Sequence, residues 1–222
     1  MDALLRRRMM FDTGSAPPPA PAPVFYDLLV FDGTAYIDTD IVPAANSSFL
    51  VALGNETLKA AQRLFALSAE NSTRIGAALA NTTTSTYRYF GIYYAASSAV
   101  STAQRVAFSY ATYNFWLTPN KFGFGSNGYS ITKGNNAPNG GVVLGSLETH
   151  SGQAYTGTMG TFYIYGSDAQ NASSASDFAN YTPVYALRPC EYNGEAGLWC
   201  VETSTFYGNT AGAGTLTVRN LS

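Results

Sequence analysis

The stretch LLVFDGTAYIDTDIVP, residues Leu28–Pro43, decides the fold of this chain. Leu28–Phe31 and Ala35–Asp38 are two short runs rich in aliphatic and aromatic residues, which are typical of β-strands. Gly33 lies between them, where a tight turn benefits from a residue without a Cβ. The stretch therefore predicts two strands joined by a turn.

The same pattern continues along the chain. Further strand-like runs are separated by Gly, Asn, Ser or Pro, and they are Phe49–Leu53, Arg63–Leu67, Tyr87–Tyr94, Arg105–Tyr110, Phe115–Thr118, Lys121–Phe124, Tyr129–Thr132, Val142–Gly145, Thr158–Tyr165, Val184–Arg188, Leu198–Val201 and Thr215–Val218. Many short strands without long helical patterns between them indicate a two-sheet sandwich. Thr57–Gln62 is predicted to form one or two helical turns, and Asp168–Phe178 a long polar loop.

Composition excludes several classes of protein. Only 12% of the 222 residues are charged and 14% are aromatic, which argues against a helical bundle or a coiled coil. A net charge of −2 and a pI near 5.3 give no electrostatic reason to bind nucleic acid. Apolar runs are far shorter than a membrane span, so no membrane span is expected. Two cysteines and one histidine cannot build a structural zinc site without carboxylates.

Three segments can be distinguished. Residues 1–14 form a candidate docking peptide, residues 15–24 carry five prolines and form a stiff extended linker, and residues 25–222 form one β domain. The docking peptide combines apolar side chains with three arginines, so it is expected to order against a partner. A basic leader without a partner is the alternative. The residues expected to dock are Leu4, Leu5, Arg6, Arg7, Arg8, Met9 and Met10.

Three motifs carry a resemblance to a known family. Leu28–Pro43, the strand GTFYIYGSDAQ at Gly160–Gln170, and the closing segment Leu187–Thr217 occur in the order expected for LamG-like, concanavalin A-like jelly-roll proteins of bacteriophages and prophages. The match spans nearly the whole β domain. Trp199–Glu202 departs from the family pattern, and the N-terminal segment is not explained by it.

The resemblance implies an all-β, two-sheet antiparallel jelly-roll sandwich preceded by an extended N-terminal arm. It also implies a non-enzymatic surface protein of the virion, such as a head fibre, a decoration protein or a tail-appended domain, assembled in the bacterial cytoplasm. The expected partner of the arm is a capsid, portal or tail protein, and repeated virion sites favour a homo-oligomer. A purely structural assembly module and a carbohydrate-degrading accessory domain are the alternatives.

Host-surface glycan is the expected ligand, because exposed aromatic rings stack on the apolar faces of sugars. The stretch from residue 87 to residue 116 is rich in aromatic residues, most of which must fill the core. The candidate glycan-binding residues are Tyr93, Tyr113 and Trp116.

Catalytic patterns are missing from the sequence. None of the six glutamates lies in the E-x-D-x-E pattern of one widespread group of jelly-roll hydrolases. His150 has no G-x-S-x-G nucleophile elbow to accompany it, so an exposed loop histidine is the simpler interpretation. The chain is therefore not expected to be an enzyme, and no cofactor is expected.

Two residue pairs leave alternatives open. Asp38 and Asp40 could contribute to a calcium site if further oxygen ligands were present, or they could cap a strand end. Cys190 and Cys200 bracket an Asn-Gly turn, so a hairpin there would permit either a disulfide or two buried free thiols.

Overall fold

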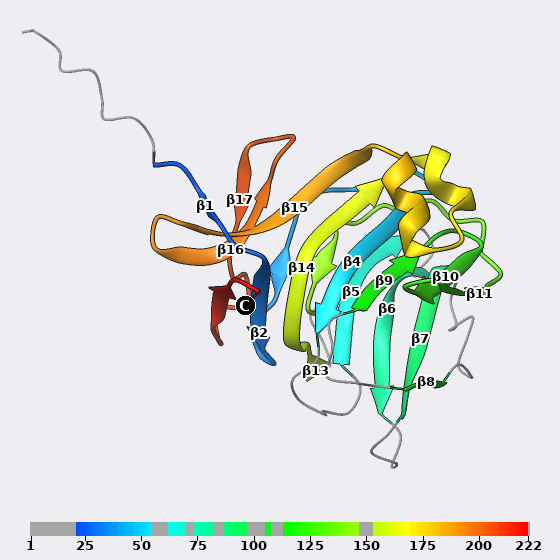
Figure 1. Cartoon of the computed structure of the whole chain (residues 1–222), viewed down its shortest axis with the longest axis horizontal. Coiled ribbons are helices and arrows are strands. Elements are labelled where there is room, and N and C mark those ends of the chain that lie inside the picture. Colours follow the sequence, from blue (N-terminus) through cyan, green and yellow to red (C-terminus); the bar gives the residue numbers. More distant parts are fainter. Residues whose placement is uncertain are drawn as a thin grey trace, which may run out of the picture.

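The computed structural model describes residues 21–54, 62–69, 73–81, 87–96, 105–107, 113–146 and 153–221. Within these residues the chain is all-β apart from two short 3-10 helices, and its strands form two sheets (Figure 1). The pairings are antiparallel, except that β13 (Gln153–Ala154) runs parallel to β5. This architecture confirms the all-β, two-sheet prediction. The docking peptide, the N-terminal part of the linker and His150 lie outside the described residues.

The first sheet has eleven strands in the described part of the chain. Eight follow one another in the order β11-β10-β9-β4-β14-β15-β16-β17, and β1, β2 and β18 pair alongside this path. Their bounds are β1 Val24–Phe25, β2 Leu28–Asp32, β4 Ser48–Gly54, β9 Tyr113–Leu117, β10 Lys121–Phe124, β11 Asn127–Ser130, β14 Thr156–Tyr165, β15 Pro183–Tyr192, β16 Glu195–Cys200, β17 Thr205–Tyr207 and β18 Leu216–Arg219.

The second sheet has seven strands in the same part of the chain, with the order β3-β12-β5-β6-β7-β8 and β13 beside β5. The bounds are β3 Ile37–Asp38, β5 Gln62–Ala69, β6 Thr73–Asn81, β7 Tyr87–Ala96, β8 Arg105–Ala107 and β12 Val143–Leu144. Its central strands lie behind β4, β9 and β14 in Figure 1, so the two sheets enclose one hydrophobic core.

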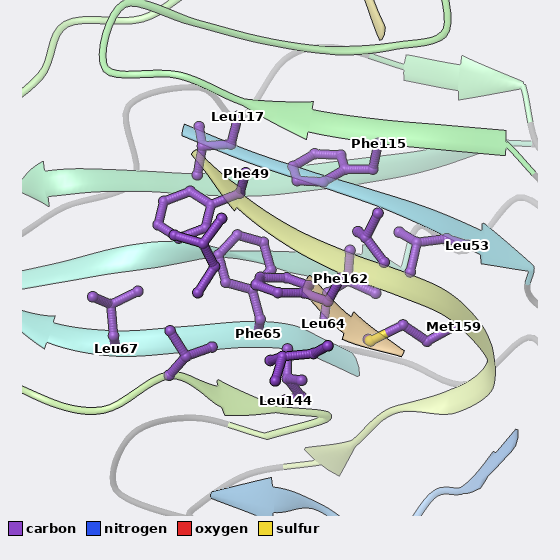
Figure 2. Close-up of a cluster of buried hydrophobic side chains, with 14 of the residues drawn as sticks. Phe49, Leu53, Leu64, Phe65, Leu67, Phe115, Leu117, Leu144, Met159 and Phe162 are labelled. Atoms are coloured by element: carbon purple, nitrogen blue, oxygen red, sulfur yellow. The ribbon is translucent and has the colours of Figure 1, made fainter. Parts of the chain in front are cut away.

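Phe65 lies at the centre of that core (Figure 2). It projects from β5 of the second sheet, and its ring centroid lies 5.3 Å from that of Phe49 and 5.1 Å from that of Phe162 on the first sheet. A third ring of the first sheet, Phe115, lies 6.3 Å away. Tilted and edge-on aromatic pairs at these distances stabilise a core beyond their buried area. Aromatic contacts across the two sheets thus centre on Phe65, within a core that also contains many Leu, Ile and Val side chains.

A buried hydrogen bond also joins the two layers. The hydroxyl of Tyr94 on β7 donates to the carbonyl oxygen of Ser47, next to β4, at 2.6 Å. Burial raises the pKa of Tyr94 well above its ordinary value, so the hydroxyl keeps its proton and remains a donor.

The opening and closing stretches of the domain are in direct contact. β2 pairs with β18, with Phe31 opposite Leu216. Thr210 donates its amide to the carbonyl of Tyr36 at 2.9 Å, and its hydroxyl accepts from the amide of Asp38 at 3.0 Å. The first and last parts of the domain are thus held together directly by strand pairing and hydrogen bonds.

Several segments differ from the prediction, among them β1, β13 and β17, which lie where no strand was predicted. The polar loop expected at Asp168–Phe178 instead contains two 3-10 helices, η2 (Ser167–Asn171) and η3 (Ala175–Asn180). β6 is an unpredicted strand, because its alanine-rich sequence TRIGAALAN has only two residues that favour strands, Thr73 and Ile75. Thr57–Gln62 was predicted to be helical. Gln62 is instead the first residue of β5, and the rest of that segment lies outside the described residues.

Candidate functional site

The structure does not bring the three predicted glycan-binding residues together. Tyr93 is half-buried on β7 of the second sheet, whereas Trp116 is on β9 of the first. Because Tyr94 points into the core, its neighbour Tyr93 faces away from it. Tyr113 is paired with Leu53 at the start of β9, and its side chain lies outside the described part of the structure.

Trp116 is fully buried, so it provides no exposed ring for a sugar. Its ring packs under η3, with the ring centroid of Phe178 6.5 Å away, and its Nε1 donates to the carbonyl of Gly125 at 3.1 Å. A Cβ at Gly123 would collide with the indole, so this glycine makes room for it. Trp116 therefore belongs to a second, small hydrophobic cluster between the outer face of the first sheet and the two 3-10 helices.

The described residues contain no group of three or more His, Cys, Asp or Glu side chains that could hold a metal ion. Asp38 is half-exposed at the end of β3, and Asp40 is exposed. The backbone amide of Asp38 is engaged by Thr210 at the closure of the sandwich. Within these residues no third carboxylate accompanies the pair, so the further oxygen ligands of a calcium site would have to be carbonyl, amide or hydroxyl oxygens or water.

The two cysteines lie in the predicted hairpin but on opposite faces of it. Cys190 on β15 is opposite Gly197, and Cys200 on β16 is opposite Leu187. Cys200 joins the core between the sheets, while Cys190 faces outward and is nevertheless fully buried. Both are free thiols, so the disulfide alternative is wrong for this structure. Burial raises the pKa of Cys190 to about 11, which keeps it protonated and unreactive.

A different group of aromatic side chains is half-exposed on β15, β16 and β17. Arg188, Trp199 and Phe206 are directly opposite one another across these three strands. Their neighbours Leu187 and Leu198 point into the core, so this row faces outward. Tyr192 is on the same face of β15 as Arg188. Phe25, on β1, is opposite Cys190 of β15 and lies on this face as well.

We call this surface the aromatic face and define it by Phe25, Tyr192, Trp199 and Phe206. The ring centroid of Tyr192 lies 5.3 Å from that of Trp199 and 5.4 Å from that of Phe206, with the rings tilted by 51° and 40°. Tyr192, Trp199 and Phe206 are half-exposed, and Phe25 is 38% exposed. The three tilted rings make a continuous surface that combines apolar faces with access to solvent.

The backbone of the hairpin is shaped to hold these rings. Asn193 and Gly194 both adopt positive φ, 54° and 80°, in the two-residue turn between β15 and β16. On β16, a Cβ at Gly197 would collide with the ring of Phe206. The absence of a side chain at Gly197 therefore leaves room for the ring of Phe206 close to the β16 backbone.

Opposite charges flank the aromatic face. The guanidinium carbon of Arg188 lies 4.2 Å from the ring centroid of Phe25, on the β1 side. On the β17 side, the carboxylate of Glu195 lies so close to Gly208 that a Cβ there would collide with it. Across β1, β15, β16 and β17, three strand spacings amount to about 14 Å. Arg188 therefore offers hydrogen-bond donors at one edge, Glu195 offers hydrogen-bond acceptors at the other, and the aromatic rings lie between them.

No protein-family model matches this chain, and no curated protein matches it. The described part of the chain also contains no helix that is long and apolar enough to cross a membrane.

The aromatic face does not stand out in the sequence, for a physical reason. Alternation along a strand does not reveal which of its two faces is covered, so Trp199 is notable in the sequence only as a departure from a family pattern. The signal that could have found it is the matched spacing of aromatic residues around the Asn193-Gly194 turn. A two-residue turn fixes the register of the hairpin and brings Arg188 opposite Trp199.

Proposed function

We propose that this chain is a non-enzymatic surface protein of a bacteriophage virion and that its jelly-roll sandwich binds host-surface glycan through the aromatic face. The observation that carries the glycan part is the group of half-exposed rings of Tyr192, Trp199 and Phe206 on the outer side of the first sheet. Large aromatic side chains left accessible on a rigid sheet, with polar groups at their edge, are typical of ligand-binding surfaces.

The chemistry of the aromatic face suits a sugar. The aromatic rings can stack against the apolar C–H face of a pyranose. The Glu195 carboxylate can accept hydrogen bonds from sugar hydroxyl groups, and the Arg188 guanidinium can donate hydrogen bonds to sugar oxygens. The rings are held by strands instead of loops, so little side-chain order has to be gained on binding. A binding module needs no more than this, and hydrolysis is not part of the proposal.

The virion part of the proposal is supported by the sequence. Its opening and closing motifs resemble those of phage virion proteins, and a proline-rich linker separates the domain from a basic, apolar peptide. In this proposal residues 1–14 dock onto a capsid, portal or tail protein, the linker projects the sandwich outward, and repeated particle sites make the protein a homo-oligomer.

A purely structural role is the second candidate, and one observation favours it. Val184 is 48% exposed and Val201 is 45% exposed, and both flank Ala186 next to the aromatic face. Exposed apolar side chains beside aromatic rings are also found where proteins assemble with one another. In that case the same surface would contact another virion subunit in place of a glycan.

Binding of the full chain to immobilised bacterial capsular and cell-wall polysaccharides separates the two candidates. We expect retention of the wild type, and a loss of about 10- to 100-fold in affinity for Trp199→Ala and Tyr192→Ala. Tyr93→Ala is the matched control, because it removes a half-buried tyrosine from the other sheet. Unchanged melting temperatures would show that the variants fold. No retention on any polysaccharide would favour the structural role.

A further inference from the structure

The guanidinium of Arg188 lies at the edge of the aromatic face and has no carboxylate partner in the described part of the chain. The side chain is exposed, and the contact that orients it is the ring of Phe25, 4.2 Å from the guanidinium carbon. Stacking on an aromatic ring fixes the plane of a guanidinium while leaving its N–H groups at the rim able to donate. These donors are arranged as a fork that matches a planar carboxylate.

The nearby acidic residues do not satisfy this fork. Glu195 lies beside Gly208 at the far edge of the aromatic face. It is paired with Tyr192, which is four residues, or about 13 Å, from Arg188 along β15. Glu191 is paired with Val24 and Ala196, so its side chain, like theirs, projects from the other face of the hairpin. Glu202 is engaged, because its carboxylate accepts the amide hydrogen of Ala186 at 2.8 Å. Among the described residues, the guanidinium of Arg188 is thus not paired with a carboxylate and can donate to a ligand.

We propose that the ligand of the aromatic face is an acidic glycan, in which the carboxylate of a uronic-acid unit pairs with Arg188 while neighbouring sugar rings stack on Trp199 and Tyr192. This inference rests on the proposed glycan-binding function and names its substrate class. The carboxylate lies at the β1 edge, and hydroxyl groups of the following units meet Glu195 at the β17 edge. This orientation keeps the two negative charges about 14 Å apart, beyond the screening length at physiological salt.

The test uses acidic polysaccharides paired with their own neutral esters. Polygalacturonate, alginate and hyaluronate are each presented to the full chain beside the methyl-esterified form of the same polymer, so charge changes while the backbone stays the same. We expect at least one acidic polymer to bind about 10- to 100-fold more tightly than its ester, the range typical of a charge-assisted contact. Raising the salt concentration should reduce this difference.

Substitutions assign the preference to Arg188. Arg188→Met should abolish the difference between acid and ester, and Arg188→Lys should restore only part of it, because an ammonium cannot pair bidentately. Arg219→Met, at an exposed arginine on β18, removes the same charge and should leave the preference intact.

Each remaining outcome has a definite meaning. Equal binding to acid and ester, unchanged in Arg188→Met, would overturn the acidic-glycan inference and leave the proposed glycan function standing. Absence of binding to all three acidic polymers would also overturn the inference. If the protein in addition failed to bind every polysaccharide of the wider panel, the proposed glycan function itself would be refuted.

Discussion

The carboxylate of Asp32 accepts a hydrogen bond of 2.5 Å from the backbone amide of Thr215, which lies 183 residues further along the chain. The same carboxylate accepts from the amide and hydroxyl of Thr34 at 2.8 Å and from the amide of Ala35 at 3.0 Å. One aspartate therefore forms the turn after β2 and joins it to the segment leading into β18. Partial burial would raise its pKa, but these hydrogen bonds outweigh that effect and lower the pKa from 3.8 to about 2.

We predict that Asp32 makes stability depend on pH in the acid range. Because its pKa is lower in the folded state, its contribution is complete above pH 3.8 and is lost as the pH falls from 3.8 toward 2. Asp32→Ala should lower the free energy of unfolding at pH 7 by about 1–2 kcal/mol, a value reduced because the group is largely exposed. Denaturant unfolding at pH 7 and pH 3 measures this. Asp168→Asn, at an exposed carboxylate of η2, serves as the control, and an equal effect there would contradict the prediction.

Phe65 is predicted to be among the most sensitive core positions. Phe65→Ala should destabilise the sandwich by about 3–5 kcal/mol, because it removes the ring that contacts both Phe49 and Phe162 and leaves a cavity between the sheets. Val184→Ala, at a position that is 48% exposed, should change stability by about 0.5 kcal/mol or less. Chemical denaturation of the two variants tests the difference, and similar midpoints would argue against this account of the core.

The cysteines are predicted to stay reduced under oxidising conditions. Their side chains leave the β15–β16 hairpin on opposite faces, so no intramolecular disulfide can form without rearrangement of the strands. A thiol reagent should label neither cysteine in the native protein and both after denaturation. Phe25→Ala should speed labelling of Cys190, which is opposite Phe25 in register, without affecting Cys200. A native mass lower by the two thiol hydrogens would contradict this prediction.

The two tryptophans should report on different environments. Trp116 is fully buried beneath η3, whereas Trp199 is half-exposed on the aromatic face. In the Trp199→Phe variant the remaining fluorescence should resist quenching by acrylamide, and Phe178→Ala should make it quenchable by removing the cover of Trp116. In Trp116→Phe the remaining fluorescence should be quenched readily, and a glycan ligand should protect it. The reverse pattern of quenching would be inconsistent with these positions.

The N-terminal peptide is predicted to determine incorporation into particles. Deletion of residues 1–14 should leave the melting temperature of the domain unchanged, because the described residues from Leu29 onward form a hydrophobic core of their own. The truncated chain should then be missing from purified virions that contain the full-length protein. Substituting Arg6, Arg7 and Arg8 together by serine should reduce incorporation as well. Normal incorporation of the truncated chain would eliminate the docking role.

Sequence reasoning worked where a local pattern determines structure. Lys121–Phe124 was predicted as a strand and forms one with the same bounds, because short apolar runs between turn residues leave few alternatives. Prediction from the sequence failed where contacts between distant segments determine whether a side chain is buried. Trp116 was expected on the surface but is covered by η2 and η3, which come from a serine- and alanine-rich segment without a strong helical pattern. The aromatic face likewise depends on strand register and on which sheet face remains uncovered, and neither follows from composition.

The alternation of side chains along β15 and β16 separates two tasks within one hairpin. Leu187, Leu198 and Cys200 fill the interior, whereas Arg188, Tyr192 and Trp199 point away from it. A mutant library limited to the outward positions would vary recognition at little cost to folding. Diversification of specificity on an unchanged scaffold, by engineering or by natural selection, would follow the same route.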